Sequence, residues 1–202
     1  MQNQFIYLAS ASPRRAQLLD QLGVRYEMLL ADGRENVERL EEPRSRELPA
    51  DYVRRVAKLK LDAARERRLR RRLPEAPILC ADTTVALGRK MFGKPAHPAE
   101  AREMLTALSG RSHRVLTAVA VSAGPLSFVE MNVTRVEFSA FGTLEIDGYI
   151  ASGEPRGKAG AYAIQGRAAR WVKHINGSYS GVMGLPLHET AVLLRRAGLT
   201  IL

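Results

Sequence analysis

The chain has 202 residues, enough for a sizeable buried core, and its hydrophobic content of 46% argues against a disordered protein. Its 31 lysines and arginines exceed its 21 acids, and the formal charge of +10 favours an anionic partner, either nucleic acid or free nucleotides. One cysteine excludes an intramolecular disulfide. The sequence has no run of ~20 apolar residues and no secretory signal pattern. We therefore expect a cytoplasmic protein without membrane partners.

Strands and helices are predicted to alternate along the first half of the chain. The apolar run 5–9 suits a buried strand, and Ser12 and Pro13 favour the start of a helix that Gly23 ends. A polar loop is then expected over 32–49. The other elements predicted here are strands over 26–30, 78–81 and 85–87 and a long helix over 50–72.

The second half continues the alternation. We expect a helix that Thr143 caps at its start, preceded by a pair of neighbouring strands. The pattern indicates an α/β protein, one compact unit over residues 1–202 with two lobes around a cleft. The elements predicted in this half are helices over 98–108, 143–150 and 187–197 and strands over 115–121, 128–138 and 171–175.

A basic run at 65–72 contributes much of the positive charge. It has no interleaved aromatic residues, so its simplest interpretation is the solvated end of a helix. Nucleic-acid binding by this segment is the alternative, and it would appear as salt-dependent affinity for DNA or RNA.

The turn at 10–15 is a candidate anion site. A helix that begins at Pro13 presents unpaired N–H groups and the positive end of its dipole. Ser10 adds a hydroxyl, and Arg14 and Arg15 add planar cationic groups that suit phosphate. The same residues are also compatible with an ordinary capped helix carrying exposed arginines.

Asp82 is the candidate catalytic acid. It follows the apolar run 78–81, and α/β sheets place ligands at the ends of such strands. A carboxylate there can hold a divalent cation or take a proton from water. Asp is also a common turn or helix cap, although no capped helix is apparent after it. The four histidines lack metal-ligand spacing, and no Gly-x-Ser-x-Gly motif is present.

Three lysines and one glutamine are the remaining candidate ligand-binding residues. Lys94 follows a glycine and Lys158 lies between two, which lets ammonium and backbone approach a phosphate. Lys60 has no specific motif, and all three lysines could simply be solvated. Gln165 lies among small residues, where its amide can donate to and accept from a planar ligand, or sit in a tight packed loop.

Taken together, these segments resemble the Maf family of nucleotide pyrophosphatases over nearly the whole chain. The resemblance implies a mixed central sheet flanked by helices around a cleft, as in Maf and ITPase-like proteins. It also implies Mg²⁺- or Mn²⁺-dependent cleavage between the α and β phosphates, and a homodimer. The segments that carry the resemblance are 10–15, 81–85, 93–95, 108–115, 158–166, 175–179 and 184–187.

Site residues follow from the same resemblance. Asp82 matches the catalytic base, and Asp82 with Glu35 matches the acidic positions near the metal. The pair Gly33-Arg34 departs from the usual apolar-acidic pair before that glutamate. The positions that match the family's phosphate-binding residues are Ser10, Arg14, Arg15, Lys60, Lys94 and Lys158.

The chain resembles the branch of the family that acts on dTTP and UTP. Arg14, Thr83 and Gln165 match its specificity positions, whereas the branch acting on 7-methyl-GTP tends to have Glu in place of Gln165. An amide complements the N–H and carbonyls of uracil or thymine, while a carboxylate would repel those carbonyls. The alternatives are the 7-methyl-GTP activity and a regulator of septum formation that acts by binding nucleic acid or protein.

Overall fold

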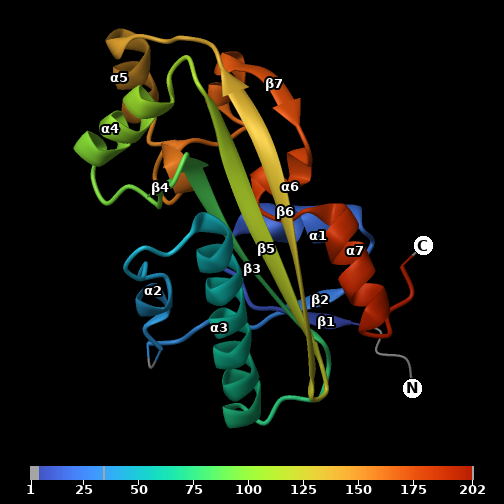
Figure 1. Ribbon diagram of the computed structural model, residues 1–202. Helices are drawn as coiled ribbons and strands as arrows, with labels where there is room; N and C mark the ends of the chain where they lie inside the picture. Colours follow the sequence, from blue (N-terminus) through green and yellow to red (C-terminus); the bar gives the residue numbers. More distant parts are fainter. Residues whose placement is uncertain (1–4, 34, 202) are drawn as a thin grey trace.

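The computed structural model describes residues 5–33 and 35–201, and a mixed sheet forms their centre (Figure 1). The strand order is β2-β1-β3-β5-β6-β7, and β4 pairs with the end of β3. Strand β1 runs parallel to β2 and β3, whereas the remaining pairs are antiparallel. The expected α/β fold with a mixed sheet is therefore confirmed. The strands are β1 (Ile6–Leu8), β2 (Tyr26–Met28), β3 (Ile78–Leu87), β4 (Lys90–Phe92), β5 (Ser112–Ala123), β6 (Leu126–Phe138) and β7 (Val172–Asn176).

Helices cover both faces of the sheet. Figure 1 shows α3 on one side of the long strands and α1 and α7 on the other. The helix α3 buries its apolar side chains against β3 and β5, whose side chains on the opposite face pack with α1 and α7. The helical elements are α1 (Pro13–Gln21), α2 (Val37–Leu40), α3 (Pro49–Arg70), α4 (Pro98–Leu108), α5 (Thr143–Ala151), η1 (Ala159–Ala161), η2 (Arg167–Trp171), α6 (Tyr179–Met183) and α7 (Leu187–Arg196).

A third apolar cluster fills the other end of the molecule, where β5 and β6 extend beyond β1. It packs α4, α5, η1 and η2 around a group of aromatic rings. Phe141 stacks on Trp171 with centroids 4.1 Å apart, and Phe138 meets Tyr162 edge-on at 4.9 Å. Because β3, β5 and β6 run through both ends, one sheet supports two lobes.

Three local predictions differ from the structure. Strand β3 is continuous, so Asp82 lies within it rather than at its end, because the β-branched residues at 83–85 extend it and β5 pairs along it. The expected loop over 32–49 contains α2. Thr143 is the first residue of α5 and not its cap: the N–H of Gly142 donates to Glu145 instead, at 3.0 Å.

The lone cysteine is a free, buried thiol. Cys80 is fully buried in β3, and burial raises the pKa of its thiol to about 12. The helices within the described ranges include none that is long and apolar enough to cross a membrane.

Candidate active site

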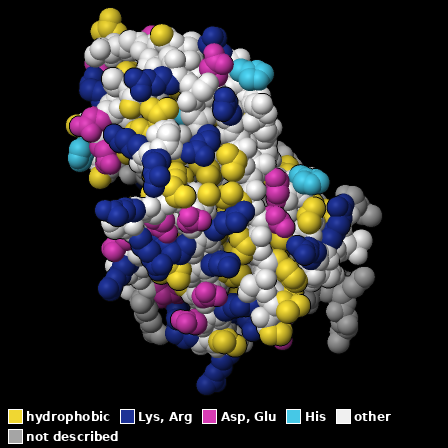
Figure 2. Space-filling view, in the orientation of Figure 1, with side chains coloured by type: hydrophobic (Ala, Val, Ile, Leu, Met, Phe, Trp, Pro, Cys, Tyr) yellow, Lys and Arg dark blue, Asp and Glu magenta, His cyan; other side chains and the backbone are white. Residues whose placement is uncertain are grey.

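A cleft of about 750 Å³ opens between the two lobes. Its walls come from the β1–α1 turn, α3, the middle of β3 and the segments 156–165 and 182–184. Figure 2 shows lysine and arginine side chains interspersed with acidic ones on the face that carries α2 and α3. The cleft brings nearly all the predicted site residues together, and Glu35 alone of the ten is missing from its lining.

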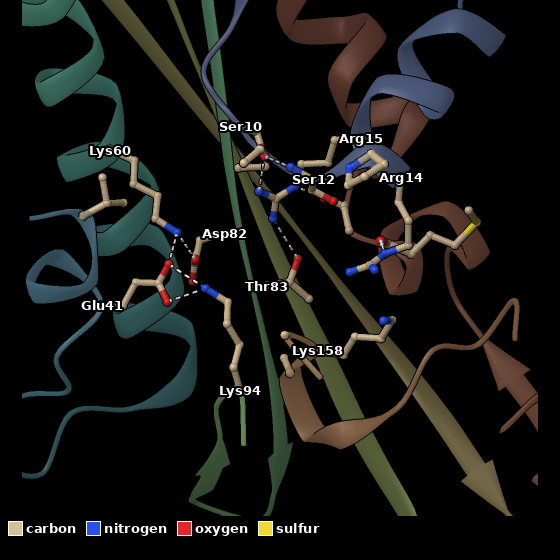
Figure 3. Close-up of a pocket in the computed structure, with 18 of the residues that line it drawn as sticks. Ser10, Ser12, Arg14, Arg15, Glu41, Lys60, Asp82, Thr83, Lys94 and Lys158 are labelled. Carbon is tan, nitrogen blue, oxygen red and sulfur yellow. Dashed lines mark hydrogen bonds and ion pairs between the residues drawn. The ribbon is translucent and has the colours of Figure 1, made fainter. Parts of the chain in front are cut away.

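Arg15 is the most constrained residue of the predicted anion turn (Figure 3). Its guanidinium donates to the Ser10 hydroxyl at 3.0 Å, the Gly184 carbonyl at 2.8 Å and the Thr83 hydroxyl at 3.4 Å. Burial lowers its pKa, and the charge of Asp82 opposes that shift, so Arg15 stays cationic. These bonds fix a positive charge at the base of the cleft.

Thr83 and Thr117 link Arg15 to the next loop through a directed chain of hydroxyls. Thr117 donates to the Gly181 carbonyl at 2.8 Å, so the hydrogen bond of 2.9 Å between the hydroxyls must be donated by Thr83. Thr83 then accepts from Arg15. The Thr83 hydroxyl therefore holds Arg15 in place.

Arg14 and Lys158 form the opposite wall of the cleft. Arg14 donates through Nε to the Met183 carbonyl at 3.1 Å, and Figure 3 shows the rest of its guanidinium turned toward the pocket. Burial lowers the pKa of both groups, and the neighbouring Arg14 charge lowers that of Lys158 further. Two cations held near each other in a cleft favour a multivalent anion.

An acidic and basic cluster lies on the α3 side. The Lys60 ammonium contacts Oδ1 of Asp82 and Oε1 of Glu41, each at 2.7 Å. Lys94 reaches the same Glu41 carboxylate at 2.7 Å. Burial alone would raise the pKa of Glu41, but the two lysines outweigh it and lower that pKa. One cation thus sits between two carboxylates, Asp82 and Glu41.

Glu41 is the site residue that sequence reasoning missed, and Glu35 has other partners. Glu35 accepts from Nε of Arg67 at 2.7 Å and from Arg70 at 2.7 Å. Arg67 lies seven residues beyond Lys60 on α3, about 10 Å along the helix. The structure therefore places Glu41, not Glu35, beside Asp82. The only sequence signal for Glu41 was its membership of an acid-rich segment.

The segment 158–166 carries Lys158 and Gln165 to the cleft. Gly160 has a φ of +67°, and its N–H donates to the Gly93 carbonyl at 3.0 Å. A Cβ at Gly160 would lie 2.8 Å from Cγ2 of Val85. Gly160 thereby ties the Lys158 loop to the loop of Lys94. Gln165 lies exposed on the cleft rim.

Two carboxylates of the cleft, Asp82 and Glu41, are the candidate ligands of a divalent metal. Within residues 5–33 and 35–201, no three His, Cys, Asp or Glu side chains are grouped to hold a metal by themselves. Asp82 and Glu41 nevertheless offer carboxylate oxygens, the ligands that Mg²⁺ and Mn²⁺ prefer, around a position that Lys60 already shows to favour positive charge. A pair of carboxylates fits a cation that takes its other ligands from phosphates and water.

The mixed sheet and a cleft that sets arginines and lysines opposite two carboxylates define an α/β protein built to bind a polyphosphate. The family model described as Maf-like protein matches residues 5–197, and the chain belongs to the Maf family.

Three similar proteins carry the name dTTP/UTP pyrophosphatase. A dTTP/UTP pyrophosphatase of Polaromonas sp. strain JS666 is 60% identical over 98% of both chains. That of Albidiferax ferrireducens is 57% identical, over 98% of this chain and 100% of the relative. That of Cupriavidus pinatubonensis is 58% identical over 98% of both.

Proposed function

We propose that this protein hydrolyses dTTP and UTP to the nucleoside monophosphate and pyrophosphate. The observation that carries the proposal is the single cleft in which Arg14, Arg15 and Lys158 face the carboxylates of Asp82 and Glu41. The names and high identity of the relatives support the same reaction and the same pair of substrates.

Binding of the triphosphate rests on charges that are already in place. Arg15, fixed by Ser10, and Arg14 with Lys158 would neutralise phosphate oxygens on one wall. Lys60 and Lys94 are ammonium groups on flexible stems and could turn from the carboxylates toward the phosphates. The site would thus exchange internal ion pairs for pairs with substrate.

Asp82 and Glu41 would hold a Mg²⁺ or Mn²⁺ ion, which when bound supplies charge neutralisation beside the phosphates. Asp82 would also accept the proton of the attacking water. The new bond joins that water's oxygen to the α-phosphorus, the bond to the α–β bridging oxygen breaks, and pyrophosphate leaves. Glu35 takes no direct part in this proposal, because Arg67 and Arg70 hold its carboxylate.

Base selection would depend on Gln165, whose exposed amide on the rim can pair with the N–H and carbonyl of uracil or thymine. Thr83 and Arg14, the other two predicted specificity residues, line the same cleft. Thr83 would contribute by fixing Arg15, since its hydroxyl is already engaged.

A panel of nucleoside triphosphates with Mg²⁺ tests the reaction. We expect dTTP and UTP to give monophosphate and pyrophosphate. Release of orthophosphate, no turnover, or a preference for 7-methyl-GTP would contradict the proposal. Asp82→Asn should abolish turnover, whereas Asp62→Asn, an exposed aspartate on α3, should retain it.

The base-reading role has its own test. Gln165→Glu should lower kcat/KM for dTTP and UTP by at least tenfold, because a carboxylate faces the base carbonyls with like polarity. An unchanged substrate profile would remove Gln165 from this role. A homodimer and a cytoplasmic location belong to the proposal too, and light scattering on the purified protein checks the first.

A further inference from the structure

The segment between β2 and α3 lines part of the cleft and carries Glu41. This strap comprises residues 29–33 and 35–48 of the part of the chain that the structure describes. The strap is fastened to the sheet at its start, where the Leu29 N–H donates to the Leu8 carbonyl at 3.0 Å, and α2 is the regular structure among its described residues. Side chains of α3 contact it further along.

Arg67 holds the amino-terminal part of the strap. It is 4% exposed, and it donates to the Leu29 carbonyl at 2.6 Å and through two nitrogens to both carboxylate oxygens of Glu35. Removing one partner of a buried ion pair leaves an uncompensated charge, so this contact is hard to exchange for solvent. Because the planar guanidinium of Arg67 makes two parallel hydrogen bonds, it fixes both the distance and the orientation of the Glu35 carboxylate.

A second contact holds the carboxy-terminal part. The Tyr52 hydroxyl donates to the Glu41 carbonyl at 2.8 Å, and Arg55 donates to the Glu42 carbonyl at 3.0 Å and to Glu47 at 2.6 Å. Glu41 is therefore held between two anchors on one rigid helix. Lys60, which its carboxylate contacts, lies on the same helix between those anchors.

We propose that Arg67 is a positioning residue that, through Glu35 and the Leu29 carbonyl, holds Glu41 beside Asp82 for binding of a divalent cation. The inference rests on the proposed function for the identity of the cation site. It assigns Glu35 an indirect role: its carboxylate fastens the strap and does not itself ligate the metal.

Four variants of the full chain test this role: Arg67→Met, Arg67→Lys, Glu35→Gln and the control Arg68→Met. Arg68 is on the same helix, but its contact is with the Pro74 carbonyl at 3.4 Å, away from the strap. The readouts are Mn²⁺ affinity by electron paramagnetic resonance without nucleotide, the Mg²⁺ concentration for half-maximal UTP hydrolysis, and Tm.

Arg67→Met and Glu35→Gln should each weaken Mn²⁺ affinity about tenfold and raise the half-saturating Mg²⁺ similarly, the size found when groups that support metal ligands are lost. Arg67→Lys should lie between them and the wild type, because lysine keeps the charge but not the fork. Arg68→Met should match the wild type. In a Glu41→Gln background, Arg67→Met should weaken Mn²⁺ binding no further.

Several results would overturn the inference. One is a lower Tm for Arg67→Met and Arg67→Lys with unchanged metal dependence, which would make Arg67 merely structural. Another is a full effect of Arg67→Met on Mn²⁺ binding in the Glu41→Gln background. A larger loss for Glu35→Gln than for Arg67→Met, persisting in that background, would make Glu35 a ligand. If wild-type protein released no pyrophosphate, the proposed function would fail, while Mn²⁺ binding would still test the strap.

Discussion

At the scale of single residues, the site is a set of opposed charges that neutralise one another. Lys60 lies between Asp82 and Glu41, and Lys94 shares Glu41. Like carboxylates so close would otherwise repel, and the lysines lower the pKa of Glu41 despite its burial. In the proposed reaction Asp82 and Glu41 would hold a divalent cation, and the two lysines would then be free to contact phosphate.

Lys60→Met should therefore reduce both binding and chemistry. We expect kcat/KM for UTP to fall about 100-fold, because an oriented cation is lost where the triphosphate's charge must be stabilised. Pyrophosphate release measures the effect. The matched control is Lys58→Met, an exposed lysine two residues earlier on α3, which should behave as the wild type. Equal rates for the two variants would remove Lys60 from the site.

His113 gives a second prediction at this scale. It is buried with Nε2 2.8 Å from the Tyr162 hydroxyl, and burial lowers its pKa from 6.5 to about 4. Between those values the unfolded chain binds a proton that the native state excludes, so stability falls as pH drops below 6.5. From pH 7.5 to 5 this group should cost about 2 kcal/mol of unfolding free energy.

Urea unfolding of the wild type and His113→Gln at both pH values checks this. The variant should be less stable at pH 7.5 but should lose about 2 kcal/mol less on acidification, because its amide does not titrate in this range. Identical pH dependence in the two proteins would show that His113 is not held neutral by the fold.

At the scale of elements, short glycine contacts set the spacing of the binding loops. Gly160 approaches Val85 of β3 and donates to Gly93, so the segment 158–166 lies against the strand that carries Asp82. Only glycine combines the positive φ with this close approach. The distance between the basic wall and the carboxylates follows from it.

Gly160→Ala should lower the unfolding free energy by about 2–4 kcal/mol, through a left-handed backbone and a clash with Val85. It should also lower kcat/KM for UTP, because Lys158 and Gln165 shift with the loop. Gly153→Ala is the control: its φ is +73°, but a Cβ there meets no atom within 4 Å. Its loss should be about 1 kcal/mol with unchanged activity, as thermal unfolding and kinetics would show.

At the scale of the whole molecule, the basic run at 65–72 is largely used within the fold. Arg67, Arg70 and Arg71 contact the strap, and Arg65 donates to the Gly124 carbonyl at 3.2 Å in the β5–β6 turn. Four arginines of the basic run therefore have hydrogen-bond partners within the protein. We therefore expect the formal charge of +10 to attract nucleotides to the cleft by a long-range field, and not to form a nucleic-acid-binding surface.

That field should accelerate nucleotide capture. Raising monovalent salt from ~20 mM to ~500 mM should lower kcat/KM for UTP several-fold, with a smaller change in kcat, because salt screens long-range attraction but acts less on buried pairs. Steady-state kinetics over this range provides the measurement. A salt-independent kcat/KM, or salt-sensitive binding of single-stranded DNA stronger than that of UTP, would contradict this assignment.

Local sequence patterns predict most elements of the fold, and nine of the ten predicted site residues line the cleft. Alternation of apolar runs, caps and glycines is local, and it indicated β1, α1, α3 and α4 close to their observed bounds. The turn before α1 predicts an anion site, because the first residues of any helix have unpaired backbone N–H groups that can donate to an anion. Family motifs around Asp82 and Lys158 added positions that the residue pattern alone left open.

The acid that lies beside Asp82 is set by the packing of the fold and not by any local pattern. The strap is rich in carboxylates and has little regular structure, so nothing local ranks Glu41 above Glu35. Their roles depend on partners far along the chain: Glu41 meets a lysine 53 residues away and Glu35 an arginine 32 residues away. Charge pairing in a folded cleft depends on where helices and strands bring these groups, and that placement is a property of the packed molecule.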